Sequence, residues 1–267
     1  MDEQTMKNKA MTLTFGDQAE NHVGMEVLGE AADNGFNLED LMRIKDYMDA
    51  LGYGHMVELI DLREIAASAL PKDAPEPEAA YVMVLRKFLT NERATRIFKE
   101  NLSYEWDKKL WNARQKKVQN KHARYNVCFD DVGRDADYEN GKGTVVSWSD
   151  VPDTHAVHRA LPVLLGEKGK GLVCEGNLYY DVKKTGIGWH GDSERKKVVG
   201  LRFGESIPLK FKWWWRAKSF GETKEIMLNH GDAYIMSEKT VGWDWKNSVK
   251  YGPTLRHSAG SEKYTKN

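Results

Sequence analysis

The spacing of apolar residues changes along the chain and predicts different elements in different regions. A weak alternation over Met11–Phe15 predicts a short strand. Apolar residues then recur at helical spacing over Leu38–Leu51, between a capping Asn37 and Gly52, which predicts a helix. Beyond residue 170, short apolar segments are separated by glycine, proline and charged residues. Many short strands in succession are typical of a β-sandwich or barrel.

The distribution of candidate chemistry divides the chain into two parts. Residues 1–90 hold the predicted helix, short apolar segments and the polar connector Lys72–Pro77, but no catalytic arrangement. We therefore expect residues 1–90 to form an N-terminal α/β accessory module and residues 91–267 to form the functional domain. A length of 267 residues is compatible with one or two domains.

Residues 91–124 are polar and basic, and we expect one or two helices there. Trp106 and Trp111 lie among the basic residues Lys108, Lys109, Arg114, Lys116, Lys117, Lys121 and Arg124. Such a stretch either follows a phosphate backbone and stacks bases, or forms a solvated helix face anchored by its tryptophans. The formal net charge of the chain is zero, so DNA or RNA binding requires a local basic patch of this kind.

The cysteines and the N-terminus indicate an intracellular protein, cytoplasmic or nuclear, rather than a secreted one. Cys128 and Cys174 are far apart and form no Cys-x-x-Cys pair, which favours a reducing compartment without a disulfide framework. The chain has no apolar run typical of a transmembrane helix. Residues 1–4 lack the basic and apolar regions of a signal peptide.

His190 and Asp192 are the strongest candidates for chemistry. A single residue separates them, so their side chains point to the same side if the segment is a strand. With a distant histidine they make the two-histidine, one-carboxylate face that suits non-haem Fe(II). Such a face leaves about three of six coordination positions open for O₂ and a bidentate co-substrate.

The sequence around this pair carries a family resemblance. Asn177–Tyr180 followed by Gly188–Glu194 resembles the Asn-x-Tyr and His-x-Asp strands of AlkB-type 2-oxoglutarate- and Fe(II)-dependent dioxygenases. Leu228–Met236 resembles the His-Gly-Asp turn and apolar strand of the same family. The resemblance covers roughly residues 123–265. It implies an α+β protein with a double-stranded β-helix (jelly-roll) oxygenase core, flanking helices and the N-terminal module.

The resemblance also implies a ligand set. His190 and Asp192 correspond to the family's iron ligands. The distal histidine of the family often follows a tryptophan soon after the apolar strand, but Asn247 occupies the matching place here. The next histidine is His257, to which we assign the distal ligand position. Asn247 is the alternative, and it would leave a weakened metal site.

Several residues are candidates for the co-substrate 2-oxoglutarate. Asn177 and Tyr179 match the family residues that contact it. An arginine beyond the distal histidine normally binds its distal carboxylate, whereas this chain offers Lys263, which we favour although lysine cannot form a bidentate fork. Arg256 precedes His257 and should point away from the site in a strand. Arg202 is a further candidate.

The implied function is an oxygenase that uses Fe(II), 2-oxoglutarate and O₂ to hydroxylate or oxidatively demethylate a C–H bond. The resemblance favours a nucleobase that leaves its stack in DNA or RNA. The expected substrate contacts are Trp189, Arg195, Trp213 and Trp215, with a basic patch formed by Lys196, Lys197, Lys210, Lys212, Arg216 and Lys218.

Three alternatives remain open from the sequence. The same chemistry could act on a peptide or small metabolite, or the chain could be a non-catalytic binding module that retains the fold. The tryptophans at 213–215 either offer a stacking surface or alternate into the core.

Overall fold

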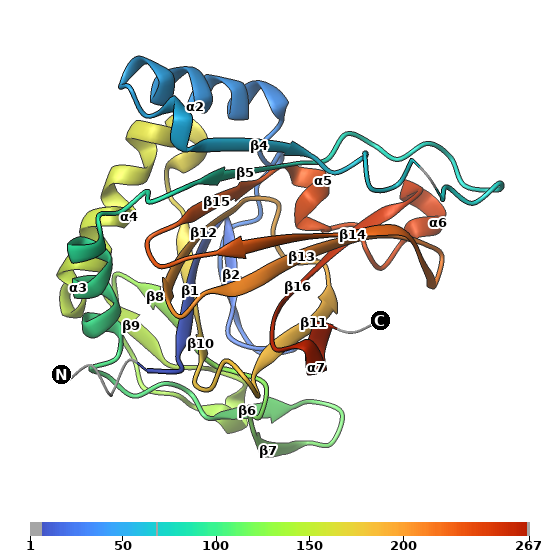
Figure 1. Ribbon diagram of the computed structural model, residues 1–267. Coiled ribbons are helices and arrows are strands. Elements are labelled where there is room, and N and C mark those ends of the chain that lie inside the picture. The colour runs from blue at the N-terminus through green and yellow to red at the C-terminus, as the bar shows by residue number, and fades with distance from the viewer. Residues whose placement is uncertain (1–6, 68, 266–267) are drawn as a thin grey trace.

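The computed structural model describes residues 7–67 and 69–265, and two facing β-sheets form its centre (Figure 1). In spatial order the larger sheet contains β4 (Val57–Asp61), β5 (Tyr81–Leu85), β15 (Ala233–Met236), β12 (Val198–Gly204), β1 (Ala10–Gly16), β10 (Val173–Tyr179), β8 (Tyr125–Asp130) and β9 (Val145–Ser147). The smaller sheet contains β11 (Gly186–His190), β16 (Thr254–Gly260), β13 (Ile207–Trp215) and β14 (Lys218–Leu228).

Four strands of the larger sheet, β15, β12, β1 and β10, are joined by antiparallel pairing, as are the four strands of the smaller sheet. Two sheets of this kind packed face to face are the architecture of a jelly roll. The structure is therefore a mixed helix and strand fold with large β-sheets, consistent with the jelly-roll core that the sequence predicts.

The first ninety residues do not form a separate module, contrary to the expected boundary at residue 90. β1 lies in the middle of the larger sheet, where it pairs along its whole length with β10 and along most of it with β12. β4 and β5 extend the same sheet beyond β15. All seven residues of β1 are buried, so this strand requires neighbours on both edges. The connector at residues 72–77 is therefore a loop rather than a domain boundary.

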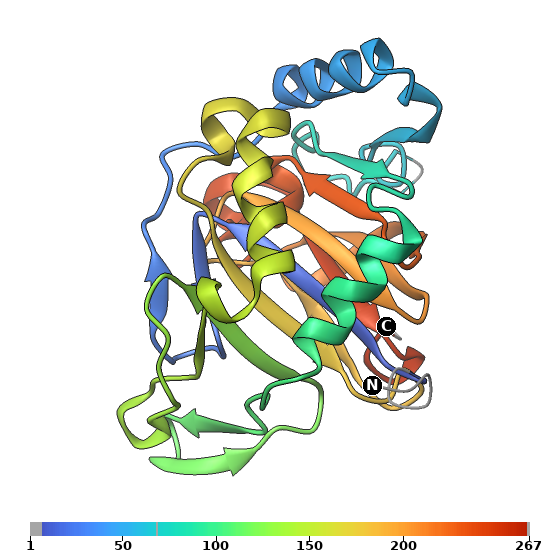
Figure 2. The same ribbon diagram turned by 90° about the vertical axis from the view of Figure 1, so that its left-hand side faces the viewer.

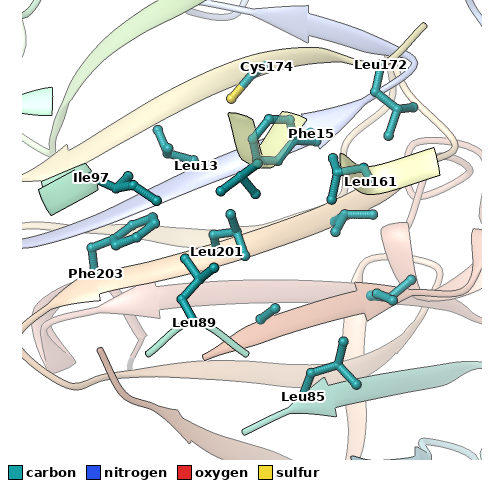
Figure 3. Packing of buried hydrophobic residues seen from close by; sticks show 14 of the residues in the cluster. Leu13, Phe15, Leu85, Leu89, Ile97, Leu161, Leu172, Cys174, Leu201 and Phe203 are labelled. Carbon is teal, nitrogen blue, oxygen red and sulfur yellow. The ribbon is translucent and has the colours of Figure 1, made fainter. Parts of the chain in front are cut away.

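Long helices cover one face of the larger sheet (Figure 2). They are α3 (Asn91–Asn101) and α4 (Pro152–Leu165), while α2 (Leu38–Ala50) packs near α4 and β4. Leu13 of β1 lies in one apolar cluster with Ile97 of α3 and Leu161 of α4 (Figure 3). The predicted strand at residues 11–15 and the helix capped by Asn37 are both confirmed, the latter with a capping box to Asp40.

Residues 102–124 are not helical, contrary to expectation. After α3 the chain forms a hairpin of β6 (Lys109–Asn112) and β7 (Lys117–Asn120), whose turn contains Lys116 with a φ of 50°. A second small hairpin joins β2 (Gln18–Glu20) to β3 (Val27–Gly29). The remaining short elements are the 3-10 turns η1 (Gly54–Met56), η2 (Tyr138–Asn140), η3 (Trp148–Asp150) and η4 (Gly166–Gly169), and the helices α5 (Glu238–Val241), α6 (Ser248–Tyr251) and α7 (Glu262–Thr265).

A second apolar cluster draws residues from both sheets. It joins Val84 and Tyr234 of the larger sheet to Phe211, Trp213 and Leu255 of the smaller one. The space between the sheets therefore holds packed side chains at one end, and the polar residues described below lie on the same inner face. None of the helices in the described parts of the chain is long and apolar enough to cross a membrane.

Candidate metal centre

His190, Asp192 and His257 come together at the edge of the smaller sheet. His190 ends β11 and lies opposite His257 in the antiparallel pairing with β16, beside a β-bulge. Asp192 follows in the loop, where its N–H donates to Val241 O at 3.1 Å. A Cβ on Gly191 would lie 2.1 Å from Gly242 O, so only glycine lets the chain pass here between the two residues.

The donor atoms of the three side chains converge. Nε2 of His190 lies 3.3 Å from Asp192 Oδ1, and Nε2 of His257 lies 3.5 Å from the same oxygen. The two imidazole rings are 4.2 Å apart between centroids. One donor atom from each residue falls within 4.8 Å of the others. Donor atoms about 2.1 Å from a shared metal ion lie about 3 Å apart at a right angle, so this spacing fits one face of a metal ion.

The hydrogen bonding of His190 fits a metal as well. Its Nδ1 donates to the carbonyl oxygen of Gly188 at 2.8 Å. A carbonyl can only accept, so the proton sits on Nδ1 and the Nε2 lone pair faces Asp192 and His257. Metal-binding histidines are usually oriented in this way by a carbonyl or carboxylate behind the ring.

The electrostatics favour the protonation states that a metal ion requires. Burial alone would raise the pKa of the Asp192 carboxyl. The nearby Arg195 and His257 outweigh that effect, so the pKa lies well below its usual range. Burial, followed by the neighbouring His190, lowers the pKa of His257. An ionised carboxylate and a neutral imidazole are the forms that bind divalent metals.

The structure brings His257, and not Asn247, beside His190 and Asp192. Asn247 is exposed at the start of α6. His257 is 7% exposed and is held by its place in the middle of β16. The segment before β16 is therefore long enough to leave Asn247 outside the site and to place His257 in it.

Asn177 and Tyr179 lie on β10, next to the metal-binding face. Both are buried and have the same orientation, because they are two residues apart in one strand. Asn177 is opposite Thr12 of β1, and Thr12 is in turn opposite Arg202 of β12. Asn177, Thr12 and Arg202 thus form a polar row across three neighbouring strands.

Arg202 differs from the other candidates for a carboxylate-binding residue. It is 1% exposed, and its guanidinium lies 5.9 Å from the ring centroid of Tyr179. Its Nε and Nη1 have no hydrogen-bond partner among the described residues. Lys263 is instead exposed on α7 over the ring of Tyr264. Arg256 points away from His257, as strand alternation predicts, and stacks on two tryptophan rings.

Two of the four expected substrate contacts, Trp213 and Arg195, are almost fully buried and are hydrogen-bonded to neighbouring groups of the protein. Trp213 is 0% exposed and donates from Nε1 to Leu62 O at 2.7 Å, because alternation along β13 turns it into the core. Arg195 is 3% exposed and is surrounded by carboxylates. Trp189 and Trp215 are partly buried, and Trp215 packs against the second apolar cluster under Arg216.

Sequence reasoning missed Glu175, and it placed Arg124 in a basic stretch without foreseeing its contact with Asn177. Glu175 lies on the same face of β10 as Asn177, to whose amide it is hydrogen-bonded. Arg124 donates from Nε to Asn177 Oδ1 at 2.5 Å. The two-residue spacing from Glu175 to Asn177 is the signal that could have identified the glutamate. The contact of Arg124 depends on strand packing and left no such signal.

Comparisons with known proteins agree with this geometry. Residues 81–242, more than half of the chain, match the 2OG-Fe(II) oxygenase superfamily. The match includes His190 and Asp192 and ends before His257. An uncharacterized protein of Acanthamoeba polyphaga mimivirus is 40% identical over 260 residues, covering 97% of this chain and 98% of that protein. The chain therefore belongs to the 2OG-Fe(II) oxygenase superfamily, whose cofactors are Fe(II), 2-oxoglutarate and O₂.

Proposed function

We propose that this protein is an AlkB-type dioxygenase that hydroxylates or oxidatively demethylates a C–H bond on a nucleobase in DNA or RNA. The observation that carries the proposal is the convergence of His190, Asp192 and His257 on one point beside the polar row of β10, β1 and β12. Membership of the 2OG-Fe(II) oxygenase superfamily supports the dioxygenase chemistry.

His190, Asp192 and His257 would hold the metal ion. Nε2 of His190, Oδ1 of Asp192 and Nε2 of His257 are the donor atoms. Bound iron, with 2-oxoglutarate and O₂, supplies the oxidation of a substrate C–H bond to an alcohol, with succinate and CO₂ as the other products. Both histidines come from strands that pair with each other, so the sheet fixes their separation before any ligand arrives.

Arg202 receives the distal carboxylate of 2-oxoglutarate in this proposal, in place of Lys263. A buried guanidinium without a counter-ion is costly, and a bound carboxylate offsets that cost through charge-assisted hydrogen bonds. Thr12 Oγ1 is also buried without a partner among the described residues and lies opposite Arg202. Thr12 and Arg202 together offer the hydroxyl and the two N–H groups that a carboxylate accepts.

The β6–β7 hairpin is the better candidate for the phosphate backbone. Its exposed basic residues are Lys109, Arg114, Lys116 and Lys117, which have no acidic partner within 4 Å among the described residues. Lys210 and Arg216 of the other expected patch are instead paired with Glu225 and Asp73. Unpaired surface cations are available to phosphates, and the hairpin leads to Arg124 at the site.

Anaerobic titration tests whether the site binds metal and co-substrate. Fe(II) plus 2-oxoglutarate should produce a weak visible charge-transfer band in the wild-type protein. His190→Ala should abolish the band, and His55→Ala, at an exposed histidine in η1, should retain it. A wild-type protein without the band would contradict the oxygenase chemistry and favour a non-catalytic binding module.

Turnover assays then test the substrate. Succinate release with methylated oligonucleotides should exceed release with free metabolites or peptides, and mass spectrometry should detect the loss of a methyl group or the gain of an oxygen atom. Succinate release that responds only to a peptide or a small metabolite would contradict the nucleobase assignment and leave the oxygenase chemistry in place.

A further inference from the structure

A buried ion cluster lies behind the metal-binding face. Arg195 donates from Nη2 to Glu175 Oε2 at 2.5 Å and to Glu194 Oε1 at 2.8 Å. Its Nε lies 3.6 Å from Asp192 Oδ2. The side chains of Arg195 and Glu175 are 3% and 7% exposed, so water screens these contacts weakly.

Arg195 and the two histidines approach different oxygens of Asp192. His190 and His257 both approach Oδ1, whereas Arg195 lies beside Oδ2. A carboxylate can rotate about its Cβ–Cγ bond, and a charge beside one oxygen restricts that rotation. The charge of the guanidinium therefore favours the carboxylate orientation in which Oδ1 faces the two histidines.

The other end of the cluster reaches the candidate co-substrate residue. Asn177 donates from Nδ2 to Glu175 Oε1 at 3.0 Å. Its Oδ1 accepts from Arg124 Nε at 2.5 Å and from Asn126 Nδ2 at 2.8 Å. These contacts fix the orientation of the Asn177 amide and leave one N–H of Nδ2 for a ligand.

We propose that Glu175 and Arg195 are positioning residues that couple the metal ligand Asp192 to the co-substrate residue Asn177. Glu175 uses Oε1 for Asn177 and Oε2 for Arg195, so the carboxylate is the link between the two sites. The inference rests on the proposed function, because it assigns a shared support to its metal and co-substrate sites. Groups of this kind behind a metal ligand typically change metal affinity by about 10- to 100-fold.

Charge balance adds an independent reason. Glu175, Glu194 and Asp192 place three carboxylates around one guanidinium, so negative groups outnumber the positive one. A divalent cation held by Asp192 offsets this excess, and the cluster in turn favours a cation at that position. The cluster therefore supports metal binding by its charge as well as by its geometry.

The test measures two dissociation constants on the same protein. Calorimetry with Mn(II), which is stable in air, gives the metal affinity, and titration of the Mn(II)-loaded protein with 2-oxoglutarate gives the co-substrate affinity. In Glu175→Gln we expect both to weaken, by about 10-fold each. Glu175→Asp keeps the charge but shortens the side chain, so it should also weaken both.

Glu194→Gln is the matched control. It removes a carboxylate from Arg195 at a similar distance but has no contact with Asn177. We expect its co-substrate affinity to stay within about 2-fold of the wild type. Equal losses of co-substrate affinity in the Glu194 and Glu175 variants would overturn the proposal, and so would unchanged constants in folded Glu175→Asp.

Two readouts separate this proposal from other failures. Circular dichroism and the thermal midpoint show whether each variant is folded, and Glu175→Asp retains the buried charge if Glu175→Gln unfolds. A wild-type protein that binds neither Mn(II) nor 2-oxoglutarate contradicts the proposed function itself. A wild-type protein that binds both, beside Glu175 variants that bind equally well, contradicts the coupling alone.

Discussion

The two faces of the larger sheet bury different chemistry, although the same strands form both. On β1, Met11, Leu13 and Phe15 pack in the apolar cluster with α3 and α4, whereas Thr12 and Thr14 alternate with them and point the other way. The helix-covered face gains stability by removing apolar surface from water. The inner face buries polar groups, such as Thr12 Oγ1 and Arg202 Nε, that lack hydrogen-bond partners among the described residues. A bound ligand can supply those partners.

This contrast separates stability from function in a single strand. A change on the helix-covered face should reduce the free energy of unfolding and leave ligand binding intact in the folded protein. A change on the inner face should alter ligand binding with a smaller cost in stability. Functional sites in general retain buried polar groups that a purely structural core would avoid.

Loss of a metal ligand should have the largest effect. In His257→Ala, turnover should fall to background because one of the three donors to the metal ion is missing, and succinate formation measures it. Asn247→Ala should retain turnover within about 2-fold, because exposed side chains away from the site contribute little. The reverse pattern would indicate that Asn247, and not His257, is the distal metal ligand.

Truncation on the helix-covered face should reduce stability strongly. Leu13 is 0% exposed, so Leu13→Ala should lower the free energy of unfolding by about 2–5 kcal/mol through lost burial and a cavity. Urea denaturation measures the change. Thr12→Val, one position away, should change it by less than about 1 kcal/mol, because it removes a hydroxyl without a partner. Equal losses in both variants would remove the distinction between the faces.

Removal of the Arg202 guanidinium should weaken binding of 2-oxoglutarate but stabilise the ligand-free protein. In Arg202→Met, the KM for 2-oxoglutarate should rise about 10- to 100-fold, since charge-assisted hydrogen bonds to the carboxylate are lost. The ligand-free variant should be more stable than the wild type by about 1 kcal/mol, because a buried guanidinium with two unbonded nitrogens, Nε and Nη1, is gone. Steady-state kinetics and thermal unfolding test the two halves separately. An unchanged KM would mean that another cation binds the distal carboxylate of 2-oxoglutarate.

The hairpin should contribute the smallest effect. Lys109→Gln with Lys117→Gln removes two cations, so it should weaken oligonucleotide binding and reduce the slope of log affinity against log salt by about 1.4 to 1.8. Fluorescence anisotropy at several salt concentrations measures both. Lys218→Gln, at an exposed position of β14 in the other patch, is the control and should leave the slope unchanged. If Lys218→Gln changes the slope more than the hairpin variant does, the phosphate contacts lie on the smaller sheet instead.

Local patterns in the sequence predicted the elements that depend on neighbouring residues. The alternation at residues 11–15 and the cap at Asn37 are properties of a few adjacent positions, and both are confirmed. The two-residue spacing also drew attention to His190 and Asp192, although Asp192 lies in the loop after β11 and not in the strand itself. These features required no knowledge of which strands pair.

Features that depend on long-range pairing could not be read in this way. The insertion of β1 between β10 and β12 joins residues more than 150 positions apart, so the sequence suggested a separate module instead. The burial of Arg202 and the link through Glu175 arise from the same pairing. His257 was reached only through a family resemblance, and the register of β11 with β16 is what places it.

A crystal structure of the protein with Mn(II) and 2-oxoglutarate tests the central claim most directly. The account predicts one metal ion about 2.1 Å from His190 Nε2, Asp192 Oδ1 and His257 Nε2, with the distal carboxylate of 2-oxoglutarate on the Arg202 guanidinium. A metal ion bound elsewhere, or a site in which the His257 imidazole turns away from the other two ligands, would contradict it.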